Sequence, residues 1–182
     1  MADYDLDNQE LESHLKELTK LAAKVAGTDI SLVNLIDNFT QWSVASEGIP
    51  VTQIPSEDSV CQYTIMENRS LEIKDLSKDD RFKNKFYVTD NPNLRYYWGV
   101  PLPTESGYNL GALFVMDLKT KIISPEKVNL LEIIAAEIMY GLKITKSIIY
   151  LQSAAKNAGE KQQQVAHGNL EILFPKAKYF KY

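Results

Sequence analysis

The residues with the most reactive side chains are few and widely spaced. The chain has one cysteine, Cys61, and two histidines, His14 and His167. One thiol cannot form an internal disulfide, and these three residues lack the spacing of zinc ligands. We therefore predict no metal site. We expect Cys61 to pack as a small apolar side chain, with redox sensing as the alternative, and His14 to be solvated on a helix.

The carboxylates do not form a catalytic pattern either. Asp37, Asp75 and Asp117 stand at the ends of predicted strands, where carboxylates usually cap turns. The sequence has no phosphate-binding glycine loop, no nucleophile elbow and no carboxylate pair beside a plausible cleft. We predict a protein that is not an enzyme.

An aromatic group offers a binding site instead. Tyr87, Tyr96, Tyr97, Trp98 and Phe114 could line a pocket for a planar ligand, with Arg81 or Arg95 as an anchor for an anion. The alternative is that these side chains only fill the core. The full set of predicted pocket residues is Cys61, Ile65, Arg81, Phe82, Tyr87, Tyr97, Trp98, Phe114 and Met116.

Hydrophobic spacing and turn residues predict the elements that must position these side chains. The first half of the chain is predicted to form a helix from Asp7 to Gly27, a hairpin of residues 29–36 and 41–45 turning at Asp37 and Asn38, and a short helix opened by Ser56 or Ser59. A strand at 71–74 and a loop at 75–93 with one helical turn follow. The last elements are a hairpin of residues 94–103 and 109–118 and a helix from Ser124-Pro125-Glu126 to at least Tyr150. The loop at 75–93 is long enough to be a lid or a binding loop.

The last predicted helix carries a heptad pattern. Its apolar positions alternate in spacings of four and three, which is typical of a helix that packs on a partner helix as well as on its own sheet. We therefore predict a parallel homodimer through Leu131, Ala135, Ile138, Leu142, Thr145 and Ile149.

The C-terminal end differs from the rest of the chain in charge. From Lys143 onward seven lysines stand against Glu160 and Glu171, although the net charge of the whole chain is −4. We predict a helical extension and a poorly structured basic tail over residues 151–182. A contact with nucleic acid or an anionic lipid is the alternative to a solvated tail, and we expect neither.

Two further features of the sequence concern location and signalling. No apolar run approaches the roughly 20 residues that cross a bilayer, so we expect a cytoplasmic protein.

Val165-Ala166-His167 is similar to the phospho-accepting helix of sensor kinases, but Gly168 replaces the usual acidic neighbour. His167 therefore lies either in a degenerate histidine box or in an unstructured end.

Local motifs resemble one family in the right order over about residues 15–143. These motifs resemble GAF domains of bacterial sensor histidine kinases and diguanylate cyclases. In chain order they are residues 28–37 followed by Gln41-Trp42, then Asp58-Ser59-Val60-Cys61, Asp80-Arg81-Phe82, residues 95–102 with a Gly-x-Pro-Leu step, and residues 110–117. The resemblance implies an α+β, PAS-like fold, with a central antiparallel sheet of five to six strands, helices on its faces and a long C-terminal signalling helix. It implies a domain over residues 1–150.

The resemblance also implies a function. GAF domains are sensory or regulatory modules whose pocket holds cyclic nucleotides, bilins or haem in some members and nothing known in others. Gln62 follows Cys61 where bilin-binding members have histidine, and sulfoxide reductases of this fold need more than one cysteine. The cofactor stays unknown, and we expect a partner or an output domain to receive the signal. The alternatives are a ligand-free dimerisation module and a remnant of a sensor kinase.

Overall fold

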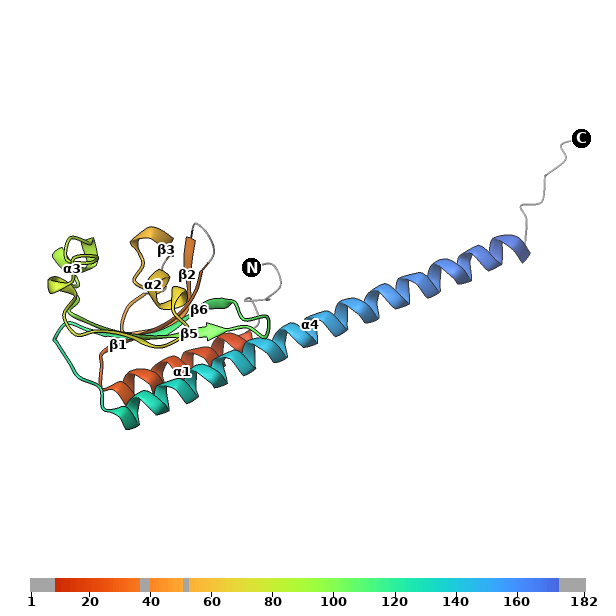
Figure 1. Cartoon of the computed structure of the whole chain (residues 1–182). Helices are drawn as coiled ribbons and strands as arrows, with labels where there is room; N and C mark the ends of the chain where they lie inside the picture. The colour runs from red at the N-terminus through yellow and green to blue at the C-terminus, as the bar shows by residue number, and fades with distance from the viewer. Residues whose placement is uncertain (1–8, 37–39, 51–52, 174–182) are drawn as a thin grey trace, which may run out of the picture.

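The computed structural model describes residues 9–36, 40–50 and 53–173, with side chains to residue 158 in the last range (Figure 1). Its elements in chain order are α1 (Gln9–Ala26), β1 (Ile30–Ile36), β2 (Thr40–Glu47), β3 (Gln53–Pro55), η1 (Ser56–Asp58), α2 (Cys61–Met66), β4 (Leu71–Ile73), η2 (Leu76–Lys78), α3 (Phe86–Thr89), β5 (Tyr96–Pro103), β6 (Asn109–Asp117) and α4 (Pro125–Leu173). The predicted α+β class, antiparallel sheet and long C-terminal helix are confirmed.

The sheet has six strands in the order β3-β2-β1-β6-β5-β4. The two predicted hairpins, β1–β2 and β5–β6, are joined side by side because β1 pairs antiparallel with β6. This pairing sets residues from both halves of the chain beside one another at the centre of the sheet. The predicted turn at Asp37 and Asn38, and Asp7 before α1, lie outside the described residues.

Strand alternation divides the buried side chains into two cores, one on each face of the sheet. On one face Trp98 and Val115 pack with Leu15 of α1 and with Ile138 of α4. On the other face Tyr97 and Phe114 pack beneath α2 and the segment between β4 and β5. Figure 1 shows α1 and α4 together on the first face, with α2 and α3 on the second.

Two short elements differ from the prediction. Gly48, Pro50 and Pro55 favour irregular backbone, and the predicted elements include no strand at residues 48–55, yet β3 pairs with the edge of β2. Three residues suffice there because an edge strand pairs on one side only and tolerates proline at its end. The segment after β4 forms two helical turns, η2 and α3, where one was predicted.

The predicted start of the last helix is confirmed, because α4 begins at Pro125. The helix then continues past the sheet, and Figure 1 shows it projecting well away from the domain. From Lys146 to Ala158 every side chain except Ile149 is exposed. Among the described residues, no helix is both long and apolar enough to cross a bilayer.

The predicted dimer seam is wrong for most of its length. Leu131, Ala135, Ile138 and Leu142 belong to the core that α4 shares with α1 and the sheet of the same chain, and Thr145 is also buried. The periodicity was correct, but a heptad pattern does not specify which surface the helix covers. The large apolar side chains that α4 leaves exposed are a different set: Leu130, Ile133, Tyr140, Ile144, Ile148, Tyr150 and Leu151.

Candidate ligand-binding cavity

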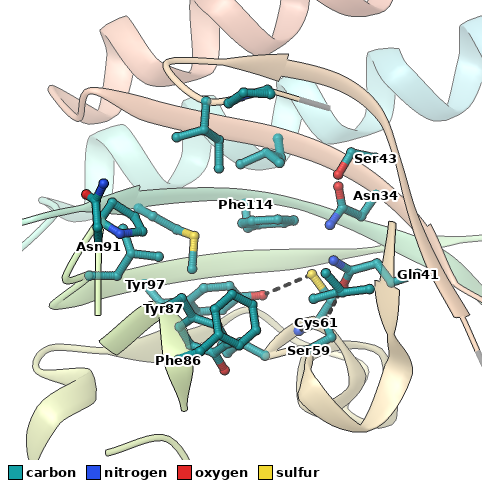
Figure 2. A pocket seen from close by; sticks show the side chains of 18 residues that line it. Asn34, Gln41, Ser43, Ser59, Cys61, Phe86, Tyr87, Asn91, Tyr97 and Phe114 are labelled. Carbon is teal, nitrogen blue, oxygen red and sulfur yellow. Dashed lines mark hydrogen bonds between the residues drawn. The ribbon is translucent and has the colours of Figure 1, made fainter. Parts of the chain in front are cut away.

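A cavity of about 460 Å³ lies on the sheet face opposite α1 and α4. Five adjacent strands, β3, β2, β1, β6 and β5, contribute to its lining, and the start of α2 and the segment from α3 to β5 enclose it (Figure 2). Its volume is within the usual range for small-molecule sites, roughly 300 to 1,000 Å³. Its described lining consists of Leu32, Asn34, Gln41, Ser43, Ile49, Pro50, Ile54, Ser59, Val60, Cys61, Phe86, Tyr87, Asn91, Pro92, Leu94, Tyr97, Phe114 and Met116.

One part of the cavity is aromatic. Tyr97 of β5 and Phe114 of β6 are stacked, with ring centroids 5.5 Å apart and an interplanar angle of 27°. Phe86 and Tyr87 of α3 form an edge-to-face pair at 5.2 Å. In Figure 2 these rings lie around the same space, from the strands on one side and from α3 on the other. Such a surface suits a flat, apolar group.

The other part is polar, and its polar groups are incompletely paired. Asn34 of β1 and Ser43 of β2 lie near each other in Figure 2 and are 1% and 6% exposed. Among the described residues, the side-chain oxygen and nitrogen of Asn34 and the hydroxyls of Ser43 and Tyr87 have no hydrogen-bond partner. Buried polar atoms are rarely left so, because each unpaired group costs about 1–3 kcal/mol. All three residues line the cavity.

A paired network lies next to these groups. The Ser59 hydroxyl donates to Gln41 Oε1 and accepts from the Cys61 backbone N–H at 2.9 Å. The Tyr97 hydroxyl lies 2.6 Å from Thr64 Oγ1 and donates to Cys61 Sγ at 3.8 Å. This network fixes the Tyr97 ring against the floor of the cavity.

Burial keeps the ionisable groups of the cavity neutral. Desolvation raises the pKa of the Cys61 thiol to about 12, and its polar neighbours Ser59, Tyr97 and Asn34 oppose that shift only in part. The Asn34 amide thus lies near the thiol, although it makes no hydrogen bond of normal geometry to it. Desolvation also raises the pKa of Tyr87 and of Tyr97 above the ordinary value for tyrosine. Cys61 is thus a protonated, buried thiol rather than a reactive thiolate at neutral pH.

Five of the nine predicted pocket residues line this cavity: Cys61, Tyr87, Tyr97, Phe114 and Met116. They come from α2, α3, β5 and β6, so the fold brings together residues that are distant in the sequence. Their binding role stays a prediction.

The other four predicted pocket residues lie elsewhere. Trp98 follows Tyr97 on the same strand and therefore points to the opposite face, into the core with α1 and α4. Phe82 is buried under Tyr63, in an edge-to-face pair at 5.1 Å. Arg81 is ion-paired with Asp79, and Ile65 is a half-buried residue of α2 outside the cavity.

Asn34 and Ser43 are not among the residues predicted from the sequence, although the sequence carries a signal for Asn34. Asn34 interrupts the apolar run Leu32-Val33-Asn34-Leu35-Ile36 of a strand that is buried throughout. A polar residue at a buried strand position needs a partner, and no neighbour in the sequence supplies one.

The remaining candidates have structural surroundings. Asp75 accepts from the Ser77 backbone N–H at 3.1 Å, and Asp117 accepts from Lys119 N–H at 2.9 Å, so both cap turns as expected. His14 is exposed on α1, close to Gly141 of α4. Asp37 and the side chain of His167 lie outside the description. Among the residues with described side chains, no three His, Cys, Asp or Glu form a group that could hold a metal ion.

A six-stranded antiparallel sheet with long helices on one face and a ligand-sized cavity on the other defines a PAS-like sensory fold. The chain belongs to the GAF domain family, whose model matches residues 10–142. It is therefore a sensory or regulatory module of signalling proteins.

Relatives support this assignment. The chain is 34% identical over 137 residues to the cyclic di-GMP phosphodiesterase PA2567 of Pseudomonas aeruginosa; the match covers 75% of this chain and 23% of that protein. The chain thus spans about a quarter of that relative.

Solved structures agree on the fold. The GAF domain of an Acinetobacter phosphoenolpyruvate-protein phosphotransferase has a TM-score of 0.63 at 16% identity, covering 76% of this chain and 85% of that chain. The type II free methionine-R-sulfoxide reductase of Thermoplasma acidophilum has a TM-score of 0.62 at 16% identity, covering 76% and 95%. The chromophore-binding domain of the bacteriophytochrome RpBphP3 of R. palustris has a TM-score of 0.62 at 15% identity, and the match covers 76% of this chain and 57% of that chain. At these identities the likeness shows the fold alone.

Proposed function

We propose that this chain is a cytoplasmic sensor module that binds a small molecule in the cavity and signals through α4 as a homodimer. The observation that carries the proposal is the set of unpartnered polar atoms on Asn34 and Ser43, which lie near each other in the lining of the cavity (Figure 2). A closed structural core would have paired or replaced them. A ligand that hydrogen-bonds to them would remove the cost of their burial.

The sheet itself supplies a route from the cavity to α4. Tyr97 of β5 lines the cavity, while its neighbours Tyr96 and Trp98 lie in the core that contains Leu131 and Ile138 of α4. A ligand that shifts β5 on one face therefore changes the packing of α4 on the other. Such a shift signals only if the ligand binds the two states of the protein with different affinity.

The exposed face of α4 supports a dimer. Leu130, Ile133, Tyr140, Ile144 and Leu151 are 40% to 65% exposed and follow the spacings of a heptad. Beyond the sheet α4 has no described neighbour, and a helix exposed on all sides is marginally stable in water. A second copy of α4 alongside the first would cover this stripe and support the projecting part. This stripe replaces the seam expected from the sequence.

Two matched tyrosines test the dimer. Tyr140 is 59% exposed on the stripe, whereas Tyr150 is 72% exposed and about 80° away around the helix. We expect Tyr140→Glu to give a monomer, because the substitution places a charge in the interface, and Tyr150→Glu to leave the dimer intact. Sedimentation velocity measures both. A wild-type monomer, or equal effects of the two variants, would reject this interface and leave any dimer to another surface.

The downstream response belongs to a larger assembly. The relative from Pseudomonas aeruginosa is a phosphodiesterase about four times as long as the matched segment, and α4 extends away from the domain as a connection to a further domain would. We infer that the chain regulates an output domain or a partner protein and is not itself the enzyme. A ligand-free dimerisation module is the competing function, and an empty, unligandable cavity would favour it.

A further inference from the structure

The described lining of the cavity has no formal charge. None of the eighteen described residues that line it is Asp, Glu, Lys, Arg or His. The ionisable groups it does contain, Cys61, Tyr87 and Tyr97, are neutral at physiological pH. A charged ligand would therefore be taken out of water without an opposite charge to compensate it.

Three cationic residues of the segment around α3 make their contacts with other groups of the protein. Arg81 makes two hydrogen bonds to the Asp79 carboxylate, at 2.9 and 2.7 Å. Lys85 pairs with Asp58 at 2.8 Å. The Arg95 guanidinium donates to backbone carbonyls, with Val88 O at 3.1 Å and Leu94 O at 2.9 Å. Arg81 and Arg95, the anion anchors suggested by the sequence, are thus held by other groups.

The unpartnered atoms specify the polar part of a ligand. The Asn34 side chain offers one acceptor oxygen and two donor hydrogens, and the Ser43 hydroxyl can donate or accept. A ligand group with both a donor and an acceptor, such as a carboxamide or a lactam, matches Asn34 on both sides. The stacked rings of Tyr97 and Phe114, with Met116 paired opposite Tyr97 in the sheet, form the apolar surface next to this polar end.

We infer that the ligand is an uncharged, flat, largely apolar molecule with a neutral group that both donates and accepts hydrogen bonds. Its polar group lies against Asn34 and Ser43, and its ring system lies along Phe114. An anionic ligand, such as a nucleotide or a carboxylic acid, would meet no side chain of opposite charge on the described lining. This inference rests on the proposed ligand-binding function and specifies its chemistry.

Two probes of nearly equal shape isolate the charge. 2-Naphthamide is neutral and carries a donor and an acceptor, whereas 2-naphthoate is an anion at pH 7. Titration of each into the ¹⁵N-labelled full chain, followed by NMR, gives the affinity and the residues perturbed. We expect the amide to bind at least about 10-fold more tightly than the carboxylate, with the largest shifts at Asn34, Ser43 and Phe114.

Matched variants assign the effect to the polar end of the cavity. Asn34→Leu removes the amide partner and should weaken 2-naphthamide binding about 10-fold, close to the affinity of the carboxylate. Asn109→Leu makes the same exchange at a residue outside the cavity, whose amide bonds to Ile65 O at 2.7 Å, and should leave binding unchanged.

Each outcome decides between the two claims. If 2-naphthoate binds as tightly as 2-naphthamide at the same residues, the neutral class is wrong, while ligand binding in the cavity stands. If the amide binds but Asn34→Leu does not weaken it, the assigned orientation is wrong. If neither probe perturbs the cavity residues at millimolar concentration, both this inference and the proposed ligand-binding function fail.

Discussion

At the scale of single residues, Asn34 is the most informative side chain of the molecule. It lies in the central strand β1, is 1% exposed, and has no hydrogen-bond partner for its amide among the described residues. Stability alone would favour leucine or valine at such a position, as at the neighbouring Val33 and Leu35. A polar group retained against stability is typical of a binding site.

This argument predicts opposite effects for the same substitution at two asparagines. Asn34→Leu should stabilise the ligand-free protein by about 1 kcal/mol, because it removes an unpaired buried amide. Asn109→Leu should destabilise the protein by a similar amount, because it breaks the bond to Ile65 O at 2.7 Å. Urea unfolding of the two variants and the wild type measures both changes. If Asn34→Leu loses stability as Asn109→Leu does, Asn34 has a structural role instead.

The same scale shows what the sequence could and could not predict about the site. The aromatic residues Tyr87, Tyr97 and Phe114 were predicted to line a pocket, and all three line the cavity. Large apolar side chains are buried in the interior, where they either fill the core or border a cavity. It failed for Trp98, since adjacent strand residues face opposite sides and the side that holds a cavity depends on packing of distant elements. The unpaired state of Asn34 could not be read from the sequence, because it depends on which atoms β2, α2 and β6 place around it.

At the scale of elements, strand β5 determines the shape of the cavity floor. A Cβ atom on Gly99 would lie 2.4 Å from the Tyr97 hydroxyl oxygen, so only glycine leaves room for the tyrosine ring to lie along the strand. In that position the hydroxyl reaches Thr64 and the ring stacks on Phe114. The glycine two residues after Tyr97 therefore sets the orientation of the ring that borders the cavity.

Substitution of this glycine should alter stability and binding together. Gly99→Ala pushes the Tyr97 ring out of its position, and we expect a loss of about 2 kcal/mol in the free energy of unfolding, as for other overpacked cores. 2-Naphthamide binding should weaken as well. Gly107→Ala is the control: φ of +83° makes alanine unfavourable there, but no atom lies within 4 Å of the added Cβ, so stability alone should fall. Unchanged probe affinity in Gly99→Ala would show that Tyr97 does not shape the site.

The elements themselves were largely predictable. Capping by Ser124 with Pro125 at the first helical position located the start of α4, and two strongly apolar runs on either side of a turn located β5 and β6. The three-residue strand β3 was missed because its stability comes from pairing with β2 rather than from its own residues. The seam of α4 was misassigned because α1 and the sheet bury the same periodic stripe that a second chain could have buried.

At the scale of the whole molecule, the sheet separates the cavity from the long helices and contacts both. The cavity lies on one face, and the helices α1 and α4 lie on the other. Successive residues of β1, β5 and β6 point to opposite faces of the sheet. The strands that form the floor of the cavity therefore also support α4. In the proposed function, this arrangement connects occupancy of the cavity to a helix that extends well beyond the domain (Figure 1).

The central claim is that the cavity holds a small ligand in a dimer formed through α4. Native mass spectrometry, which preserves noncovalent contacts, tests both parts in one spectrum, on protein incubated with excess 2-naphthamide and on the Asn34→Leu variant treated in the same way. The account predicts a wild-type dimer carrying up to two ligands and a variant dimer that carries far fewer. A wild-type protein without added mass, in either oligomeric state, would contradict the account and leave α4 as the arm of a purely structural module.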